Sequence, residues 1–563
     1  MITNKARSKR IWITLLLNGT LLTLCLDQSL AQQNRLPYLR KQGTATQLIV
    51  DDKPFLVLAG ELGNSSSSSL DYMTPVWPKL SAMKLNTVLL PVSWELIEPI
   101  EGKFDFTLLD GLIQAARSHN LRLVPLWFGS WKNSMSSYAP AWVKTDQRRF
   151  PRSQDKAGNG MEILSPFSKQ NVEADARAFA AFMKHLREVD GSQHTVIMVQ
   201  VENEIGMIPD SRDRSQIANE LFNESVPAEL MNYLLERKEQ LIPEFRSVWG
   251  ENGFKTRGTW EEIFGRGPAT DEIFMAWYFA RFTQRVTELG KAEYKLPMFV
   301  NAALIRPGHL PGQYPSAGPL PHLMDVWRAG APAIDFLAPD IYFQNFAEWV
   351  RKYDRSGNAI FIPEAMPGPI DSVNAMYAIA QHNSIGFSPF AIDTLDEETA
   401  NKVTESYDVL TQLTPLILAH QGKGLMAGLL SEGPEQRQPQ QLRFGSYLLN
   451  VTFDRQAPQA PGAIQNPGVV QFSTSPGVLS GGLVIATGDG EYIFAGTGLT
   501  ITFEANAAGD PLVGLLTVDE GKFVSGKFVP GRRLNGDQTH QGRHVRLPPG
   551  RFGIQRVTLY RYR

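Results

Sequence analysis

The chain has 563 residues, 43% of them hydrophobic, and its 55 Lys and Arg residues against 57 Asp and Glu residues give a net charge of −2. This length can bury a large core and suggests more than one domain. Beyond residue 31 the chain has no basic tract of the kind that a nucleic-acid partner would require. The single cysteine, Cys25, excludes disulfides within the chain, and none of the nine histidines belongs to a His-Glu-x-x-His metal motif. We therefore expect no metal and no cofactor.

The first 31 residues have the pattern of an export signal. A basic stretch over residues 5–10 precedes an apolar run over residues 11–26, and the triplet SLA at 29–31 is a small-x-small cleavage site. The run is interrupted at Asn18 and Gly19 and is shorter than the roughly 20 residues of a spanning helix, so an uncleaved anchor is the weaker alternative. Lipidation is disfavoured because the large Leu24 precedes Cys25. We expect export to the periplasm or the outside, with no stable membrane insertion after cleavage.

From about residue 50 to 395, within a barrel domain expected at residues 45–430, the chain repeats one theme, in which a short apolar run is followed by a polar or aromatic loop and then a helical stretch. Eight apolar runs occur, at residues 55–61, 87–94, 122–128, 195–202, 298–304, 334–342, 359–364 and 385–393. Amphipathic stretches such as 106–119, 168–189, 272–295 and 372–382 fit crossover helices between parallel strands. The pattern predicts a (β/α)₈ barrel of the α/β class with an insertion between residues 206 and 297, which would wall the mouth of a site.

After the helical stretch 403–421 the pattern changes, and residues 434–563 predict a smaller all-β domain. Short strands separated by glycines are expected at residues 469–473, 482–486, 491–495, 499–504, 544–547 and 552–560. This arrangement is typical of a β-sandwich or a similar sheet domain. We expect it to brace the barrel, with glycan binding as the alternative.

Two glutamates occupy equivalent positions at the ends of predicted strands. Glu204 follows the fourth strand and Glu364 ends the seventh. In this fold the catalytic groups stand at the carboxyl ends of the strands, where the loops converge. A pair of carboxyl groups is what cleavage of a glycosidic bond requires, since one protonates the leaving oxygen while the other attacks the sugar.

Two segments resemble known glycoside hydrolases. Residues 199–206 (VQVENEIG) closely resemble the acid/base segment of glycoside hydrolase family 35, the β-galactosidases, and residues 94–106 (WELIEPIEGKFDF) resemble a second signature of that family and are similar to family 42 as well. The resemblance covers about residues 45–400. The sheet domain resembles the one found on a bacterial subset of family 35.

The resemblance implies a role for each residue of the site. Glu204 would be the acid/base, Glu364 the nucleophile, and Asn203 would bond the hydroxyl next to the anomeric carbon. Glu202 is a competitor for the first role, because residues two apart face the same way in an extended strand. The Asn-Glu order of the family selects Glu204.

Other strand ends supply candidates for sugar binding, because aromatic rings stack on sugars while carboxylates and amides bind hydroxyls. They are Glu61, Trp94, Trp127, Trp131, Asn301, Asp340 and Tyr342. Core or rim packing is the alternative for each aromatic residue. Tyr342 is the strongest candidate, since families resembling this one place a tyrosine after strand six.

The sequence thus predicts an exported, retaining exo-β-galactosidase with a carbohydrate substrate, for which galactosylated xyloglucan is one source. The alternatives are a related barrel hydrolase with another sugar preference and a non-catalytic carbohydrate-binding protein. The second would be expected to lack one of the two carboxylates. The oligomeric state is left open.

Overall fold

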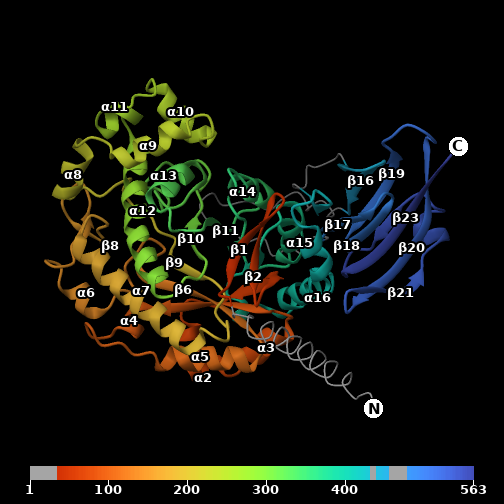
Figure 1. Ribbon diagram of the computed structural model, residues 1–563, viewed down its shortest axis with the longest axis horizontal. Helices are drawn as coiled ribbons and strands as arrows, with labels where there is room; N and C mark the ends of the chain where they lie inside the picture. Colours follow the sequence, from red (N-terminus) through yellow and green to blue (C-terminus); the bar gives the residue numbers. More distant parts are fainter. Residues whose placement is uncertain (1–34, 432–438, 455–478) are drawn as a thin grey trace, which may run out of the picture.

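The computed structural model describes residues 35–431, 439–454 and 479–563, which form a barrel and a smaller domain of two β-sheets (Figure 1). The predicted signal at 1–31 and the predicted strand at 469–473 lie outside the described residues. Within these three described stretches, no helix has both the length and the apolar character needed to cross a bilayer.

Eight parallel strands close into the barrel, in the order β10-β11-β12-β13-β4-β5-β6-β9. The strands are β4 (Val57–Glu61), β5 (Thr87–Ser93), β6 (Arg122–Lys132), β9 (Val199–Asn203), β10 (Met298–Ala303), β11 (Phe336–Ile341), β12 (Ile362–Ala365) and β13 (Gly386–Pro389). Each overlaps one of the eight predicted runs. The predicted (β/α)₈ barrel followed by an all-β region is therefore confirmed.

Helices follow every barrel strand and surround the barrel (Figure 1). The main helix after each strand is, in chain order, α3 (Val76–Ala82), α5 (Thr107–Ser118), α7 (Lys169–Asp190), α12 (Pro268–Glu293), α13 (Met324–Gly330), α14 (Phe346–Tyr353), α15 (Asp371–Gln381) and α16 (Glu397–His420). Successive side chains of a strand point to opposite faces. Leu90, Trp127 and Val300 accordingly lie in the core between the strands and the helices.

The barrel interior is apolar below the strand ends. Leu126, Phe299 and Phe361 form one buried cluster with Leu48 and Val50. The last two belong to β2 (Ala45–Val50), the middle strand of an antiparallel sheet with β1 (Tyr38–Gln42) and β3 (Lys53–Phe55). This sheet precedes β4 and adds apolar side chains to the interior, so the polar groups described below lie above a closed apolar floor.

The expected insertion follows β9 and forms four helices before α12, visible at the upper left of Figure 1. They are α8 (Gln216–Asn223), α9 (Ala228–Glu236), α10 (Pro243–Glu251) and α11 (Trp260–Phe264). Shorter elements complete the other loops, namely α2 (Leu70–Met73), α4 (Trp94–Ile97), α6 (Ala141–Thr145), β7 (Arg152–Gln154) and β8 (Gly160–Leu164).

The C-terminal region contains a six-stranded sheet, β14-β17-β18-β23-β20-β21, and a four-stranded sheet, β15-β16-β19-β22. The strands are β14 (Met426–Leu430), β15 (Gln440–Phe444), β16 (Tyr447–Phe453), β17 (Gly481–Gly488), β18 (Glu491–Thr497), β19 (Leu499–Ala505), β20 (Leu512–Val524), β21 (Lys527–Arg533), β22 (Val545–Leu547) and β23 (Gly553–Tyr562). Because β14 pairs with β17, this domain begins inside the range 45–430 that was predicted for the barrel.

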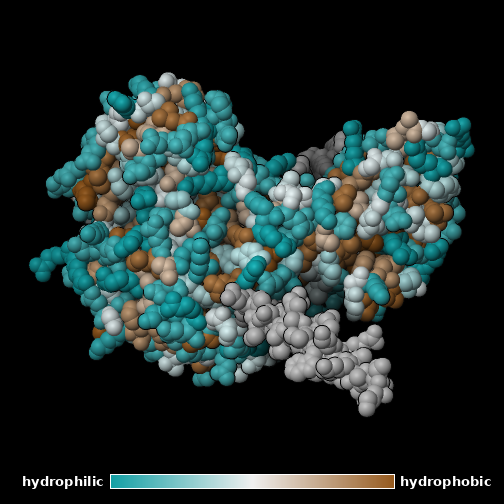
Figure 2. Space-filling model, viewed as in Figure 1, coloured by the Kyte–Doolittle hydropathy of each residue, from teal (hydrophilic) through white to brown (hydrophobic). Residues whose placement is uncertain are grey.

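The six-stranded sheet is buried on both faces where it meets the barrel. Along β17, Val484 and Ala486 share a core with the four-stranded sheet, whereas Leu483 and Ile485 join the barrel core. Helix α15 lies against β14, where a Cβ on Gly428 would come within 2.7 Å of the Tyr377 carbonyl oxygen. Figure 2 shows the two lobes in contact, with a hollow between them at the top of the view.

We expect Gly428→Val to lower the free energy of unfolding by about 1–3 kcal/mol, because the added side chain cannot fit beneath α15. Gly553→Val is the matched control, since no atom lies within 4 Å of a Cβ at that position. Denaturant unfolding of both variants measures the effect. Equal stability of the two variants would show that the sheet domain does not brace the barrel through this contact.

Candidate active site

Glu204 stands just beyond β9, where the backbone leaves the extended conformation. Glu202 has φ +60° and Glu204 has φ +45°, both in the left-handed region. The two side chains therefore do not share a face, and the expectation that Glu202 faces the same way as Glu204 is wrong. The Glu202 carboxylate accepts a hydrogen bond from the Trp131 amide (2.8 Å), whereas the Glu204 carboxylate accepts one from the exposed Asn133 side chain.

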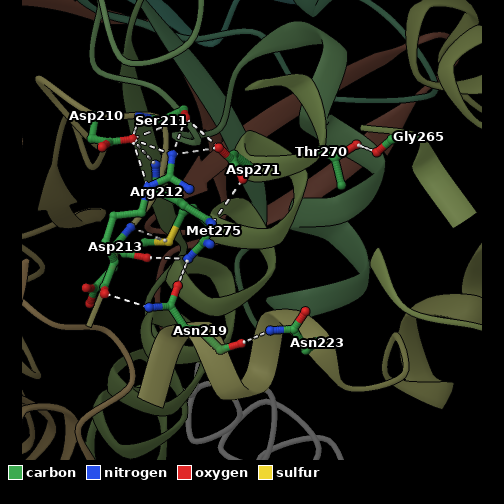
Figure 3. A network of polar contacts seen from close by, with 11 residues as sticks. Asp210, Ser211, Arg212, Asp213, Asn219, Asn223, Gly265, Thr270, Asp271 and Met275 are labelled. Atoms are coloured by element: carbon green, nitrogen blue, oxygen red, sulfur yellow. Dashed lines mark hydrogen bonds and ion pairs between the residues drawn. The ribbon is translucent and has the colours of Figure 1, made fainter. Parts of the chain in front are cut away.

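The chain after Glu204 is fastened to the N-terminal part of α12 by a network of ion pairs (Figure 3). Arg212 pairs with Asp271 (3.0 Å), and Arg214 pairs with Asp210 (2.6 Å) and with Asp271 (2.8 Å). On the other side, a Cβ on Gly206 would lie 2.7 Å from the carbonyl carbon of Pro315, so only glycine fits there. These contacts fix the segment that carries Glu204.

Glu364 lies in β12, beside Asp340 of the neighbouring strand β11. The Tyr342 hydroxyl donates a hydrogen bond to one carboxylate oxygen of Glu364, and the other oxygen has no hydrogen-bond partner among the described residues. Carboxylate oxygens of Glu204, Asp340 and Glu364 all lie within 4.8 Å of one another. The two predicted catalytic carboxylates are thus brought together.

Four further predicted residues are buried around this pair. Asn301 accepts a hydrogen bond from the Glu204 amide (2.9 Å) and donates one to Asp340 (2.7 Å). Both carboxylate oxygens of Glu61 and both polar side-chain atoms of Asn203 have no hydrogen-bond partner among the described residues. Buried polar groups of this kind carry a desolvation cost unless a ligand bonds them. Glu61, Asn203 and Asp340 are therefore candidates for binding sugar hydroxyls.

The three predicted tryptophans do not line the site, so their prediction as sugar-stacking residues is wrong. All three are fully buried in helix packing. The indole of Trp94 donates to Glu98 (2.9 Å), that of Trp127 to Asp175 (2.9 Å) and that of Trp131 to a backbone carbonyl. The rings of Trp127 and Trp131 also pack against phenylalanines of α7 and α12, respectively.

The sequence reasoning missed Lys132, the last residue of β6. Its side chain is 5% exposed, and its ammonium lies 5.2 Å from the ring centroid of Phe128, a residue of the apolar barrel interior. The ammonium therefore stands near the barrel axis, where it acts electrostatically on Glu364, Glu204 and Glu61. A lysine within an otherwise apolar strand is the signal that could have revealed it, because a buried lysine requires acidic partners.

Burial and crowding of the carboxylates set the ionisation of the site. Burial, with the charge of Glu364 as the next cause, raises the pKa of Glu204 to about 7, while Lys132 opposes the rise. Burial and Glu364 also raise the pKa values of Glu61 and Asp340 well above their usual range. Glu204 can therefore hold a proton near neutral pH, as a general acid must.

Lys132→Met should move the alkaline limb of the kcat/KM profile to higher pH, by roughly one unit. The positive charge of Lys132 favours ionised Glu204, so its removal lets Glu204 keep its proton to higher pH. Lys144→Met is the control, because Lys144 lies at the surface and pairs with Glu95. If the alkaline limb of the Lys132→Met profile stayed in place or moved to lower pH, Lys132 would not be the group that lowers the pKa of Glu204.

Glu204, Asp340 and Glu364 are also the residues that could hold a metal ion, judged by the spacing of their oxygens. The same carboxylates accept hydrogen bonds from Asn133, Tyr342 and Asn301, and they share the cation Lys132. A hydrogen-bonded carboxyl cluster suits acid/base chemistry as well. That the reaction needs no metal stays a prediction.

Comparison with known proteins points to β-galactosidases. Residues 77–296 match a family profile described as β-galactosidase. This profile is that of glycoside hydrolase family 42, and it covers less than half of the chain. The predicted membership of family 35 is therefore not confirmed. The matched range includes Lys132, Asn203 and Glu204, whereas residues 403–546 match a domain of unknown function.

Individual relatives cover only part of the chain. It is 29% identical over 194 residues to a β-galactosidase of Xanthomonas manihotis, which corresponds to 34% of this chain and 30% of that protein. Similar solved structures include the β-galactosidase of Rahnella sp. R3, with 15% sequence identity and a TM-score of 0.45 over 67% of this chain and 58% of that one. They also include the β-galactosidase of Marinomonas ef1, with 13% sequence identity and a TM-score of 0.42 over 64% of this chain and 60% of that one. The chain thus spans under a third of the curated relative and about three-fifths of these structures.

Proposed function

We propose that this protein is a retaining β-galactosidase that releases galactose from the non-reducing ends of glycans, with galactosylated xyloglucan as one source of substrate. The observation that carries the proposal is the approach of Glu204 and Glu364 oxygens to within 4.8 Å. Retaining enzymes hold their carboxyl groups about 5–5.5 Å apart, while inverting enzymes need roughly 6.5–9.5 Å to admit a water.

In the first step Glu364 attacks the anomeric carbon while Glu204 gives its proton to the glycosidic oxygen, so that the bond to the leaving alcohol breaks. Burial and Glu364 raise the pKa of Tyr342, so its hydroxyl keeps its proton and remains a donor to Glu364. This bond orients the nucleophile, and the second Glu364 oxygen stays free for attack. The product is a galactosyl ester of Glu364.

In the second step Glu204, now ionised, takes a proton from water, and the oxygen of that water attacks the anomeric carbon and displaces Glu364. Two inversions give net retention. The raised pKa of Glu204, about 7, suits both halves of this cycle, because the group must exist in both protonation states at working pH.

Sugar recognition falls to the buried polar groups around the pair. Asn203 has both side-chain atoms free to bond the hydroxyl next to the anomeric carbon, and Glu61 and Asp340 offer oxygens to others. Glu61, Glu204 and Glu364 are each less than 5% exposed, a depth that suits the end of a glycan chain better than its middle. The match of residues 77–296 to a β-galactosidase profile supports galactose as the sugar.

A panel of nitrophenyl glycosides tests this proposal, with the configuration of the first product followed by NMR. We expect the β-galactoside to be preferred by at least about 100-fold and the first product to be β-galactose. Preference for another sugar would favour a related barrel hydrolase. Binding of galactosides without turnover would favour a carbohydrate-binding protein.

We further propose that the protein is exported to the periplasm or the outside. The support is the basic stretch, apolar run and small-x-small site within residues 1–31. N-terminal sequencing of the protein from fractionated cells should find a chain that begins at residue 32. A protein that keeps Met1 and stays in the cytoplasm would contradict export.

A further inference from the structure

Directly behind the acid/base residue lie two buried carboxyl groups that the proposed reaction does not use. Glu202 belongs to β9 and Asp175 to α7, and both are fully buried. Glu202 bonds the amide of Trp131, and Asp175 bonds the amide of the adjacent Ser130 (2.9 Å). A Cβ on Gly129 would lie 2.7 Å from Glu202 Oε1 and 2.3 Å from the Trp127 indole nitrogen, which donates to Asp175, so the two carboxyl groups are neighbours. Burial raises the pKa of Glu202 well above its usual range, and the charge of Asp175 and a hydrogen bond with it raise that pKa further.

The donors around the two groups differ and indicate which one is ionised. Asp175 accepts three hydrogen bonds, from the Trp127 indole (2.9 Å), the Ser130 amide (2.9 Å) and the Ser130 hydroxyl (2.5 Å). Glu202 accepts one, and its Oε1 has no donor among the described residues. A carboxylate is stabilised by several donors, whereas a carboxylic acid can itself donate.

The Glu202–Asp175 pair also contacts the two chain segments that carry the residues of the site. Ser130 and Trp131 directly precede Lys132 and Asn133, and Asn133 is the residue that donates to Glu204. On the other strand, Glu202 takes φ +60°, a left-handed conformation that is strained for a non-glycine residue and persists only where its surroundings hold it. The bond from Trp131 to Glu202 is such a restraint, and Glu204 follows two residues later.

We propose that Glu202 is a neutral acid that donates its proton to ionised Asp175, and that this pair positions Glu204, Lys132 and Asn133 for catalysis. The pair ties the end of β6 to the end of β9 through one shared proton. Glu202 is thus a positioning residue. The catalytic part of this inference rests on the proposed galactosidase function, whereas the assignment of the proton does not.

Two isosteric variants test the assignment. Glu202→Gln keeps a donor for Asp175 and an acceptor for Trp131, so kcat should stay within about threefold of wild type. Asp175→Asn turns an N–H₂ group toward the Trp127 indole or the Ser130 donors and should lower kcat by about tenfold or more. If Asp175→Asn were tolerated and Glu202→Gln were as damaging as Glu202→Ala, the proton would belong to Asp175 and the proposal would be overturned.

The positioning role predicts an effect that depends on the leaving group. Glu202→Ala should lower kcat/KM about 100-fold for galactosides that need protonation of the leaving oxygen, because a small misplacement of the acid is costly. Activated aryl galactosides should lose much less. An equal loss on both substrates, in parallel with a loss of thermal stability, would mean that Glu202 only supports the fold.

Infrared difference spectra test the proton without any assay of activity. Subtracting the spectrum of Glu202→Gln from that of wild type should reveal one carboxylic-acid carbonyl band, and loss of a carboxylate band instead would refute the assignment. A wild-type protein inactive on every galactoside would count against the proposed function alone, because the infrared result would still decide the state of Glu202.

Discussion

Glu364→Ala is expected to lower turnover of every β-galactoside by about 10⁴-fold or more, including those with excellent leaving groups. In the proposed reaction Glu364 supplies the oxygen that bonds the anomeric carbon, and its Oε2, which has no hydrogen-bond partner among the described residues, is the candidate atom for that attack. Without it no glycosyl-enzyme can form, and a good leaving group does not compensate. Steady-state assays with nitrophenyl and unactivated galactosides measure the loss.

The control for this variant is Glu348→Ala, which removes an exposed glutamate that pairs with Lys352 on α14. It should keep wild-type kinetics. Glu364→Ala protein that was folded by circular dichroism and still cleaved aryl galactosides at a tenth of the wild-type rate or faster would exclude Glu364 as the nucleophile.

Glu204→Ala should separate the two steps of the reaction. An aryl galactoside scarcely needs protonation of its leaving oxygen, so the intermediate still forms but then stalls, since no base activates water. Azide needs no base. Added azide should therefore raise turnover roughly tenfold or more and give β-galactosyl azide, while unactivated galactosides lose about 10²–10⁴-fold in rate and are not rescued.

Glu202→Ala is the matched comparison for this rescue, because it removes the neighbouring glutamate of the same segment. Its carboxyl group is bonded to Trp131 on the far side of the strand, so azide should not change its kinetics. Rescue of Glu202→Ala by azide, together with near-normal activity of Glu204→Ala, would reverse the assignment of the acid/base residue.

The barrel and the meeting of the two strand-end carboxylates could be predicted because they depend on patterns that a linear sequence displays. Apolar runs such as 359–364 mark buried strands, and the fold places strand ends on one face, so Glu204 and Glu364 were expected to meet. The C-terminal sheets were predicted less completely. Strands β14, β15, β16, β20 and β21 were not predicted, and β21 shows one reason, since its exposed, mixed residues lack a continuous apolar run.

The side-chain directions at strand ends could not be predicted. Side chains alternate between the two faces of a strand only where the backbone is extended. The left-handed φ of Glu202 ends this alternation just before Glu204, so the relative directions of the two glutamates could not be predicted. The direction of Trp127 could not be predicted either. A residue at a strand end can point into the barrel or toward the helices, and the sequence does not indicate which of the two it does. Lys132 escaped notice because a lone lysine is usually a surface residue.

The covalent intermediate on Glu364 is tested most directly by mass spectrometry of Glu204→Ala mixed with an activated aryl β-galactoside. We expect a protein heavier by one galactosyl residue, with the added mass on the proteolytic peptide that contains Glu364. An unmodified protein that releases α-galactose as its first product, or a galactosyl group on another carboxylate, would contradict this expectation.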